Sequence, residues 1–218
     1  MEIEYSRFEV NPEIFGEKLI TGVYDLDGNF IYRNLYRLEK LKINNMLTVR
    51  SFLLLSSMNK KKYTLAKNLL NDLEITPQMR RKKLVNLAFG DYIKVLIIKM
   101  ILISSKTIVL KNIEISFTSK ELTNIFHVLR RNLKNYPKKI IYISKNINCI
   151  IPNTDYYIIT KDNKVVYSGD DINSLPVKTE LMEIVDLANK KGAKLKYYKD
   201  VNDLLKAIYK NVEKWNIL

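Results

Sequence analysis

Apolar residues recur along much of the chain at the spacing of amphipathic helices. Leu65, Leu69, Leu70 and Leu73 fall on one helical face, and a nearly all-apolar helix is predicted from Asp91 to about Ile103. A further helix is predicted to begin at Thr118-Ser119-Lys120-Glu121, because this sequence has the form of a capping box. The core-facing stripe of that helix comprises Leu122, Ile125, Phe126, Leu129 and Leu133.

Short β-branched runs on either side of the capped helix predict two strands. The runs 107–110 and 140–143 are uniformly apolar, which is typical of parallel strands that are covered on both faces. Together with the helix they predict a βαβ unit. Further along, the runs 156–160 and 165–168 flank the polar segment 161–164 and predict an antiparallel hairpin.

The two ends of the chain are predicted to contain additional strands and helices. At the beginning, Arg7–Val10 predicts a short strand, and the segment 22–32 predicts a hairpin that turns at Asp27-Gly28. Near the end, a helix is predicted from about Thr179 and a strand at 195–198. A closing helix follows, with its apolar positions at Leu204, Leu205, Ile208 and Val212.

Composition places the chain among globular proteins of ordinary size. Its 218 residues are 47% hydrophobic, enough to fill the core of one domain. Cys149 is the single cysteine, which excludes a disulfide scaffold and favours a reducing compartment. The opening Met-Glu-Ile-Glu-Tyr lacks the features of a signal peptide. The most apolar stretch, 95–103, is interrupted by Lys99 and is far shorter than the roughly 20 residues that a membrane span needs.

The chain is strongly basic, with 37 Lys and Arg, 23 Asp and Glu, and a formal net charge of +14. Such a charge attracts nucleic acid, an anionic bilayer surface or an acidic partner. A second interpretation is a base-composition bias of the coding DNA, because Lys, Asn, Ile and Tyr are abundant throughout. Clustering of the basic residues would distinguish the two interpretations.

Motifs of the common catalytic classes are missing from the sequence. One cysteine and one histidine cannot supply a zinc tetrad, and no GxxxxGK[ST], GxGxxG or GxSxG motif occurs. His127 lies within the capped helix, where we expect a structural or surface role. We therefore expect neither a metal nor a nucleotide cofactor.

Several short segments follow one another in a characteristic order and spacing. Leu87-Ala88-Phe89-Gly90 opens the predicted apolar helix, and Lys111 follows Leu87 by 24 residues. Ser144-Lys145 follows the strand 140–143, and Asp155 precedes the hairpin that ends at Gly169. In this order, roughly residues 7 to 170 resemble the ATPase domain of ABC transporters. Leu87–Gly90 then stands at that family's Leu-Ser-Gly-Gly signature, Lys111 at its Walker B aspartate and Lys145 at its switch histidine, and Asp155 and the hairpin match its distal elements.

The resemblance implies an α/β fold with a mixed or parallel sheet wrapped by helices, similar to P-loop NTPases. It implies a single domain over residues 1–218, with a truncated β-rich N-terminal part at 1–45 and a small helical subdomain at 46–105. The βαβ unit and hairpin occupy 106–170. The last segment, 171–218, is an αβα appendage without a family counterpart, for which dimerisation or docking is the expected role.

The positions that carry chemistry in the family differ in this sequence. Gly16 is followed by 17–22 without a glycine-rich loop, so the phosphate loop and its helix are expected to be deleted. Lys111 and Asn112 replace the metal-supporting aspartate and the water-activating glutamate. The remaining departures are the missing glutamine between Tyr36 and Leu47, Ala88 and Phe89 in the signature, Thr118 at the D-loop aspartate, and Lys145 at the switch histidine.

The resemblance therefore implies a catalytically inactive subunit that binds neither ATP nor Mg²⁺. Its expected role is structural or regulatory, with a membrane permease, an active ABC ATPase subunit or a second copy as partner. Its expected location is cytoplasmic and peripheral, at the inner face of the membrane, where anionic lipids attract basic residues. The expected docking residues, for which an ordinary core role is the alternative, are Met46, Leu47, Thr48, Val49 and Phe52.

The alternative function is a basic module that binds anions or, with less support, nucleic acid. Lys111 and Lys145 are predicted to follow adjacent strands, at the edge where open α/β sheets bind ligands. In the competing interpretation each lysine pairs with a carboxylate such as Glu114.

Overall fold

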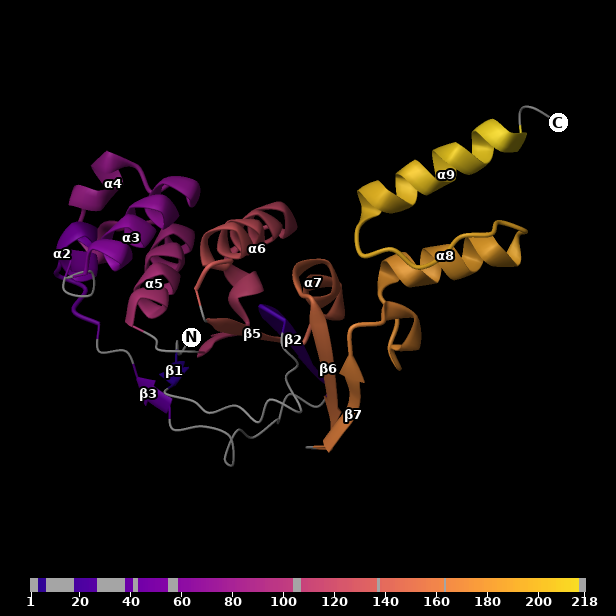
Figure 1. Ribbon diagram of the computed structural model, residues 1–218, viewed down its shortest axis with the longest axis horizontal. Coiled ribbons are helices and arrows are strands. Elements are labelled where there is room, and N and C mark those ends of the chain that lie inside the picture. The colour runs from indigo at the N-terminus through magenta and orange to yellow at the C-terminus, as the bar shows by residue number, and fades with distance from the viewer. Residues whose placement is uncertain are drawn as a thin grey trace.

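The computed structural model places a five-stranded mixed sheet at the centre of the protein (Figure 1). Its strands, in the order β4-β5-β2-β6-β7, are Thr107–Lys111, Lys139–Ser144, Ile20–Asp25, Tyr156–Lys161 and Lys164–Gly169. The structure describes residues 4–6, 18–26, 38–40, 43–54, 59–103, 107–136, 138–162 and 164–215.

Strand β2 occupies the middle of the sheet and is paired in parallel on both sides. Ile20 is opposite Ile140 of β5, and Thr21 is opposite Tyr156 of β6. β4 and β5 are also parallel, whereas β6 and β7 form the predicted antiparallel hairpin. The predicted α/β fold class, with a mixed sheet flanked by helices, is confirmed.

The N-terminal hairpin predicted over residues 22–32 is wrong. Both edges of β2 are already occupied by β5 and β6, so a following antiparallel strand has no free backbone groups to pair with there. Its turn at Asp27-Gly28 and the strand predicted at Arg7–Val10 lie outside the described residues. A separate two-stranded antiparallel sheet joins β1 (Glu4–Ser6) to β3 (Leu38–Lys40).

Helix α6 (Ser119–Leu133) connects β4 to β5 and completes the predicted βαβ unit. The Thr118 hydroxyl accepts a hydrogen bond from the Glu121 amide at 3.3 Å, and the Glu121 carboxylate accepts one from the Thr118 amide at 2.8 Å. This capping box satisfies two of the amides that a helix start leaves unpaired. All five residues of the predicted core-facing stripe are buried, which confirms the helix and its orientation.

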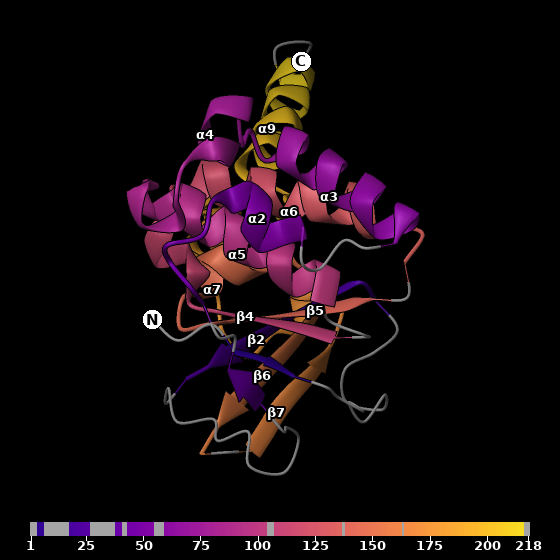
Figure 2. The same ribbon diagram turned by 90° about the vertical axis from the view of Figure 1, so that its left-hand side faces the viewer.

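The helical subdomain lies at one end of the sheet and faces the viewer in Figure 2. Its longest helix, α5, has eight buried apolar residues and begins two residues before the predicted Asp91. The predicted face of α3 is confirmed at Leu65, Leu69 and Leu73, which are buried, while Leu70 is partly buried. The helices are α2 (Val49–Leu54), α3 (Lys60–Asp72), α4 (Pro77–Arg81) and α5 (Phe89–Ile103), with the 3₁₀ turn η2 at Leu84–Asn86.

The C-terminal segment forms an arm at the opposite end of the sheet (Figure 1). It contains the 3₁₀ turn η5 (Ile172–Ser174) and the helices α8 (Glu180–Lys190) and α9 (Val201–Trp215). The strand predicted at 195–198 is wrong. The Leu195 amide donates to Asn189 Oδ1, and the Leu195 carbonyl accepts from Asn189 Nδ2, both at 2.8 Å. The backbone of Leu195 is therefore paired with a side chain and not with a neighbouring strand.

Helix α7 (Ile147–Ile150) and the 3₁₀ turn η4 (Ile151–Asn153) press closely on β2 at Gly22. A Cβ atom at Gly22 would lie 2.4 Å from Ile150 Cγ2 and 2.7 Å from Thr154 Oγ1. Both distances are shorter than van der Waals contact, so only glycine fits this point of the central strand. None of the described helices is long and apolar enough to cross a membrane.

Lys99 is the one lysine among the buried residues of the described chain, with 8% of its surface exposed. Its ammonium donates a hydrogen bond to the carbonyl of Phe52 in the last turn of α2, at 2.6 Å, and lies 4.6 Å from the centre of the Phe52 ring. Burial lowers the pKa of Lys99 because the charged form loses its hydration. The contact fixes α2 on α5.

We predict that Gly22→Ala lowers the free energy of unfolding by about 1–3 kcal/mol, because the added methyl group overpacks the contact with α7 and η4. Urea unfolding would measure the loss. In an Ile150→Ala background the same substitution should cost less, since the nearest atom is gone. An equal cost in both backgrounds would contradict this explanation.

A second prediction concerns pH. Because the pKa of Lys99 is lowered in the folded state, the unfolded chain binds more protons between that pKa and the ordinary one near 10.4, so folding is favoured as pH rises. The stability of the wild type relative to Lys99→Met should therefore increase from neutral pH to about pH 10.

The matched control is Lys120→Met, which removes an exposed ammonium from α6. Its stability relative to the wild type should not change over the same pH range. Chemical denaturation at a series of pH values gives both differences. A flat or falling difference for Lys99→Met would contradict the assigned effect of burial.

Candidate functional site

The carboxyl ends of β4, β5, β2 and β6 meet at one edge of the sheet, which we call the carboxyl edge. The last residues of these strands are Lys111, Ser144, Asp25 and Lys161. In open α/β sheets this edge is where ligands bind. It is therefore the candidate functional site.

At the end of β4 the backbone turns sharply at Asn112. This residue has φ 50° and ψ 36°, a left-handed conformation that asparagine tolerates better than most residues. Its amide donates a hydrogen bond to Ile143 of β5 at 2.8 Å, which extends the pairing of β4 with β5 by one residue. Lys111 is exposed just before the turn, and Lys145 is exposed just after β5. The structure thus places the two predicted lysines at the ends of adjacent strands.

The carboxylate of Glu114 is held by two side chains from β5. Glu114 lies in the 3₁₀ turn η3 (Ile113–Ser116) that follows β4. The hydroxyl of Ser144 donates to Glu114 Oε1, and the hydroxyl of Tyr142 donates to Oε2 at 3.0 Å. Ser144 Oγ also accepts a hydrogen bond from the Asn146 amide at 2.9 Å. Two hydroxyl groups of β5 therefore hold the Glu114 carboxylate. The pairing of Glu114 with a lysine stays a prediction.

This cluster raises the pKa of the groups around it. The pKa of Tyr142 lies far above its usual value, first because of burial and then because of the nearby Glu114 charge. Burial and Glu114 also raise the pKa of the Cys149 thiol. Both groups are therefore neutral at physiological pH, and Cys149 is a poor nucleophile. Glu114 was not among the predicted site residues, because η3 brings it back to β5 only in the folded chain.

The central strand ends in a second carboxylate, Asp25, which is buried. It accepts a hydrogen bond from the hydroxyl of Thr160 on β6 at 3.2 Å. The following residue, Leu26, donates its amide to the Thr160 carbonyl at 3.1 Å. Sequence reasoning missed Asp25, although an aspartate at the end of a buried strand is the signal that could have identified it.

The position expected for the phosphate loop must be corrected. A P-loop connects a strand to a helix, but Ile20–Gly22 lies inside β2, so the interval from Gly16 to Gly22 cannot be that connection. Gly16 itself lies outside the described residues. The connection that follows β2 begins after Asp25. The sequence of 26–37 contains one glycine, Gly28, and no lysine.

The signature-like segment opens a helix, as expected from the resemblance. Helix α5 begins at Phe89, whose side chain is 55% exposed; Ala88 is also exposed and Leu87 is half-buried. A Cβ atom at Gly90 would lie 3.4 Å from the Phe117 ring and from the Ser116 carbonyl oxygen, so α5 starts beside the turn after β4.

Thr118, which the resemblance placed at the D-loop aspartate, directly precedes α6, and His127 lies within that helix. Thr118 is exposed, and its side chain caps α6. His127 is exposed on α6, a surface position. Within the described part of the chain, no three His, Cys, Asp or Glu side chains are grouped so that they could hold a metal ion.

The predicted docking residues divide into surface and core. Met46 is 61% exposed, and Leu47 and Thr48 are half-buried. Val49 and Phe52 are 0% and 3% exposed and belong to the hydrophobic core, so docking through these two side chains is wrong. Their burial follows from the helical spacing of α2, which turns both toward α5. Val49 also donates its amide to the Lys82 carbonyl at 3.1 Å, which fixes this segment against the end of α4.

No protein-family model matches the chain, and no curated protein matches it either. Solved structures do match. One is cbiO1 from Clostridium perfringens, part of the ABC transporter complex cbiONQ, with 15% identity and a TM-score of 0.53 over 78% of this chain and 64% of that chain. Another is MJ1267, an ATP-binding cassette of an ABC transporter in its ADP conformation, with 13% identity and a TM-score of 0.56 over 88% of this chain and 100% of that chain.

This chain therefore spans about two thirds of cbiO1 and the whole of MJ1267. At these identities the likeness concerns architecture alone. The protein has the fold of the ATP-binding cassettes of ABC transporters.

Proposed function

We propose that the protein is an ABC-cassette-like subunit that does not hydrolyse ATP and serves a membrane transporter complex as a structural or regulatory partner. The observation that carries this proposal is the end of β4, where the cationic side chain of Lys111 is followed by Asn112 in a left-handed turn. Hydrolysis in this family needs a carboxylate there to support Mg²⁺ and a second to activate water. An ammonium group repels the metal that such a reaction requires.

The carboxylates that do lie at the carboxyl edge support the same proposal. Glu114 accepts hydrogen bonds from Tyr142 and Ser144, and Asp25 accepts one from Thr160. These contacts occupy some of the lone pairs with which the carboxylates could bind a metal or polarise water. The sequence after β2 also lacks the lysine and the run of glycines with which a P-loop holds triphosphate. We infer a cassette in which packing is retained without a nucleotide site.

The proposed partner is a membrane permease, an active ATPase subunit, or both. Among the matching structures, MJ1267 is an ATP-binding cassette of an ABC transporter, and cbiO1 is part of an ABC transporter complex. The segment that contains Met46 is held to η2 by backbone hydrogen bonds, with the Leu84 amide donating to the Leu47 carbonyl at 2.9 Å. Met46 therefore stands exposed on a rigid base, which suits a docking residue. We place the protein at the cytoplasmic face of the membrane.

The alternative, an anion- or nucleic-acid-binding module, has a weaker basis in the structure. Lys111 and Lys145 do lie at the ends of adjacent strands, but Asp25 and Glu114 lie at the same edge. The mixed charge there lowers the attraction for a phosphate backbone.

We predict that the full chain shows no saturable, Mg²⁺-dependent binding of ATP in a calorimetric titration, because it lacks both a phosphate cradle and a metal-supporting carboxylate. The variant Lys111→Asp/Asn112→Glu restores the aspartate and the glutamate that the family has at the end of this strand. It should still lack ATPase activity, because it has no glycine-rich loop to bind the phosphates. Glutamate in the left-handed turn should also cost about 1 kcal/mol of stability. Tight ATP binding by the wild type would contradict the proposal.

We also predict that the tagged protein co-purifies with a polytopic membrane protein from detergent-solubilised membranes of its own cells. Met46→Glu should reduce the recovery several-fold without changing the melting temperature, because the side chain is exposed. The matched control is Val166→Glu, which introduces the same charge at an exposed position of β7. Elution of the wild type as an isolated monomer would count against a transporter partner.

A further inference from the structure

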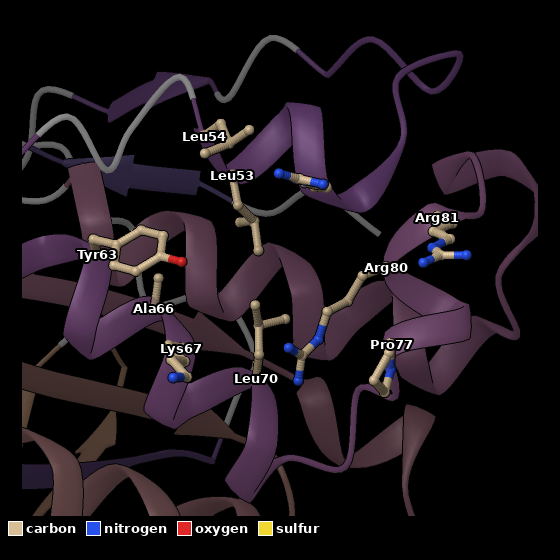
Figure 3. Close-up of a pocket in the computed structure, with 10 residues that line it drawn as sticks. Leu53, Leu54, Tyr63, Ala66, Lys67, Leu70, Pro77, Arg80 and Arg81 are labelled. Carbon is tan, nitrogen blue, oxygen red and sulfur yellow. The ribbon is translucent and has the colours of Figure 1, made fainter.

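A cavity open to solvent lies between α2, α3 and α4 in the helical subdomain, distant in the fold from the carboxyl edge. Its volume is about 300 Å³. Figure 3 shows Leu53 of α2 and Leu70 of α3 pointing toward each other across it, with Arg80 reaching in from α4. Ala66 and Pro77 add further apolar surface. The interior is thus mainly hydrocarbon.

The charged residues that line this cavity are all cations. They are Arg50, Lys67, Arg80 and Arg81, from all three helices. Within the described part of the chain, none of the four forms an ion pair with a carboxylate. Arg80 is fixed by neutral acceptors, the Ile75 carbonyl at 2.8 Å and Asn71 Oδ1 at 2.6 Å. Its position is therefore defined, while its charge is not neutralised.

The surroundings of the cavity are basic as well. Residues 46–105 contain eleven Lys and Arg and three Asp and Glu, so they carry a net +8 of the chain's +14. This clustering of basic residues argues against a base-composition bias of the coding DNA, which would spread them evenly along the chain. The first turn of α3 has Lys60, Lys61 and Lys62 and no acidic residue, although the helix dipole disfavours cations there. These three ammonium groups add to the positive charge of the helical subdomain.

The size of the cavity limits what can enter it. One turn of an α-helix rises 5.4 Å and is 10–12 Å wide with its side chains, so it occupies about 400 Å³ or more. A peptide helix could therefore insert only single side chains. A volume of about 300 Å³ is instead at the lower end of the range for small ligands. A hydrocarbon chain with an anionic head satisfies both the apolar interior and the cationic lining.

The mouth of the cavity has the composition of a membrane-facing surface. Leu54 and Tyr63 line it and are 46% and 55% exposed. Tyrosine beside basic residues is typical of the membrane–water interface, where the ring meets the headgroups. α2, α3 and α4 also lie at an outer end of the molecule, where the other described helices and strands leave them uncovered (Figure 2).

From these observations we propose that the cavity between α2, α3 and α4 binds an anionic phospholipid of a bilayer. The phosphate lies among Arg50, Lys67, Arg80 and Arg81, and an acyl chain packs on Leu53 and Leu70. This binding does not depend on a permease partner or on the absence of ATP hydrolysis. It would hold the helical subdomain directly against an anionic membrane.

The test is co-sedimentation of the full chain with phosphatidylcholine vesicles that either contain or lack phosphatidylglycerol. We expect binding only to the anionic vesicles. Arg50→Gln/Lys67→Gln/Arg81→Gln should weaken it about a hundredfold, since each basic residue near an anionic surface contributes about fivefold. Arg80 is left unchanged because its hydrogen bonds support α4. Circular dichroism melting would confirm that the variant is folded.

The matched control is Lys190→Gln/Lys191→Gln/Lys194→Gln, which removes the same charge from exposed positions at the end of α8. This control should bind nearly as well as the wild type. An equal loss in both triple variants would overturn the proposal, because the effect would then come from net charge alone. Equal binding to neutral vesicles would overturn it too.

Entry of the acyl chain is tested separately. Leu54→Asn, at an exposed position, should weaken vesicle binding several-fold, and a soluble short-chain phosphatidylglycerol should compete far better than glycerol 3-phosphate or inorganic phosphate. Equal competition by inorganic phosphate would overturn the acyl-chain contact. An acidic amphipathic peptide that binds here while anionic vesicles do not would overturn the lipid assignment in favour of a protein partner.

Discussion

The parallel pairing of β2 with both β5 and β6 is the constraint on which the rest of the structure depends. It buries the central strand completely enough that α7 and η4 touch its backbone at Gly22, where no side chain fits. Parallel neighbours cannot be joined by a tight turn, so long crossover connections are required. α6 is such a connection, between β4 and β5. The same parallel arrangement gathers the ends of four strands at one edge.

The carboxyl edge and the helical subdomain differ in their electrostatics. At the edge, buried or half-buried carboxylates are matched to hydroxyl donors, as in the contact of Glu114 with Ser144 and Tyr142. Such hydrogen bonds offset part of the cost of burying a carboxylate. In the helical subdomain, cations from three helices surround an apolar cavity without carboxylate partners among the described residues. The carboxylates of the carboxyl edge find hydrogen-bond donors within the protein. The cations of the helical subdomain suit the anionic phospholipid that we propose as their ligand.

Sequence reasoning succeeded where the signal is local and failed where the answer depends on distant partners. The capping box at Thr118 and the stripe on α6 were predicted correctly, because capping and helical periodicity act over three or four residues. The predicted hairpin over 22–32 failed, because the neighbours of β2 come from more than 100 residues away. The predicted strand at 195–198 failed because the side chain of Asn189 forms the hydrogen bonds with the Leu195 backbone that a neighbouring strand would otherwise form.

The sequence by itself determined the helices α3, α5, α6, α8 and α9, the βαβ unit, the β6–β7 hairpin, the α/β class and the absence of a phosphate-loop motif. Hydrophobic spacing and capping motifs encode such elements directly. Only the tertiary structure decided that β2 is the central strand, that Val49 and Phe52 are core residues, and that Glu114 meets Ser144. It also collected four separate cations around one cavity. Strand order and side-chain neighbours arise from contacts between residues far apart in the chain, which no local pattern records.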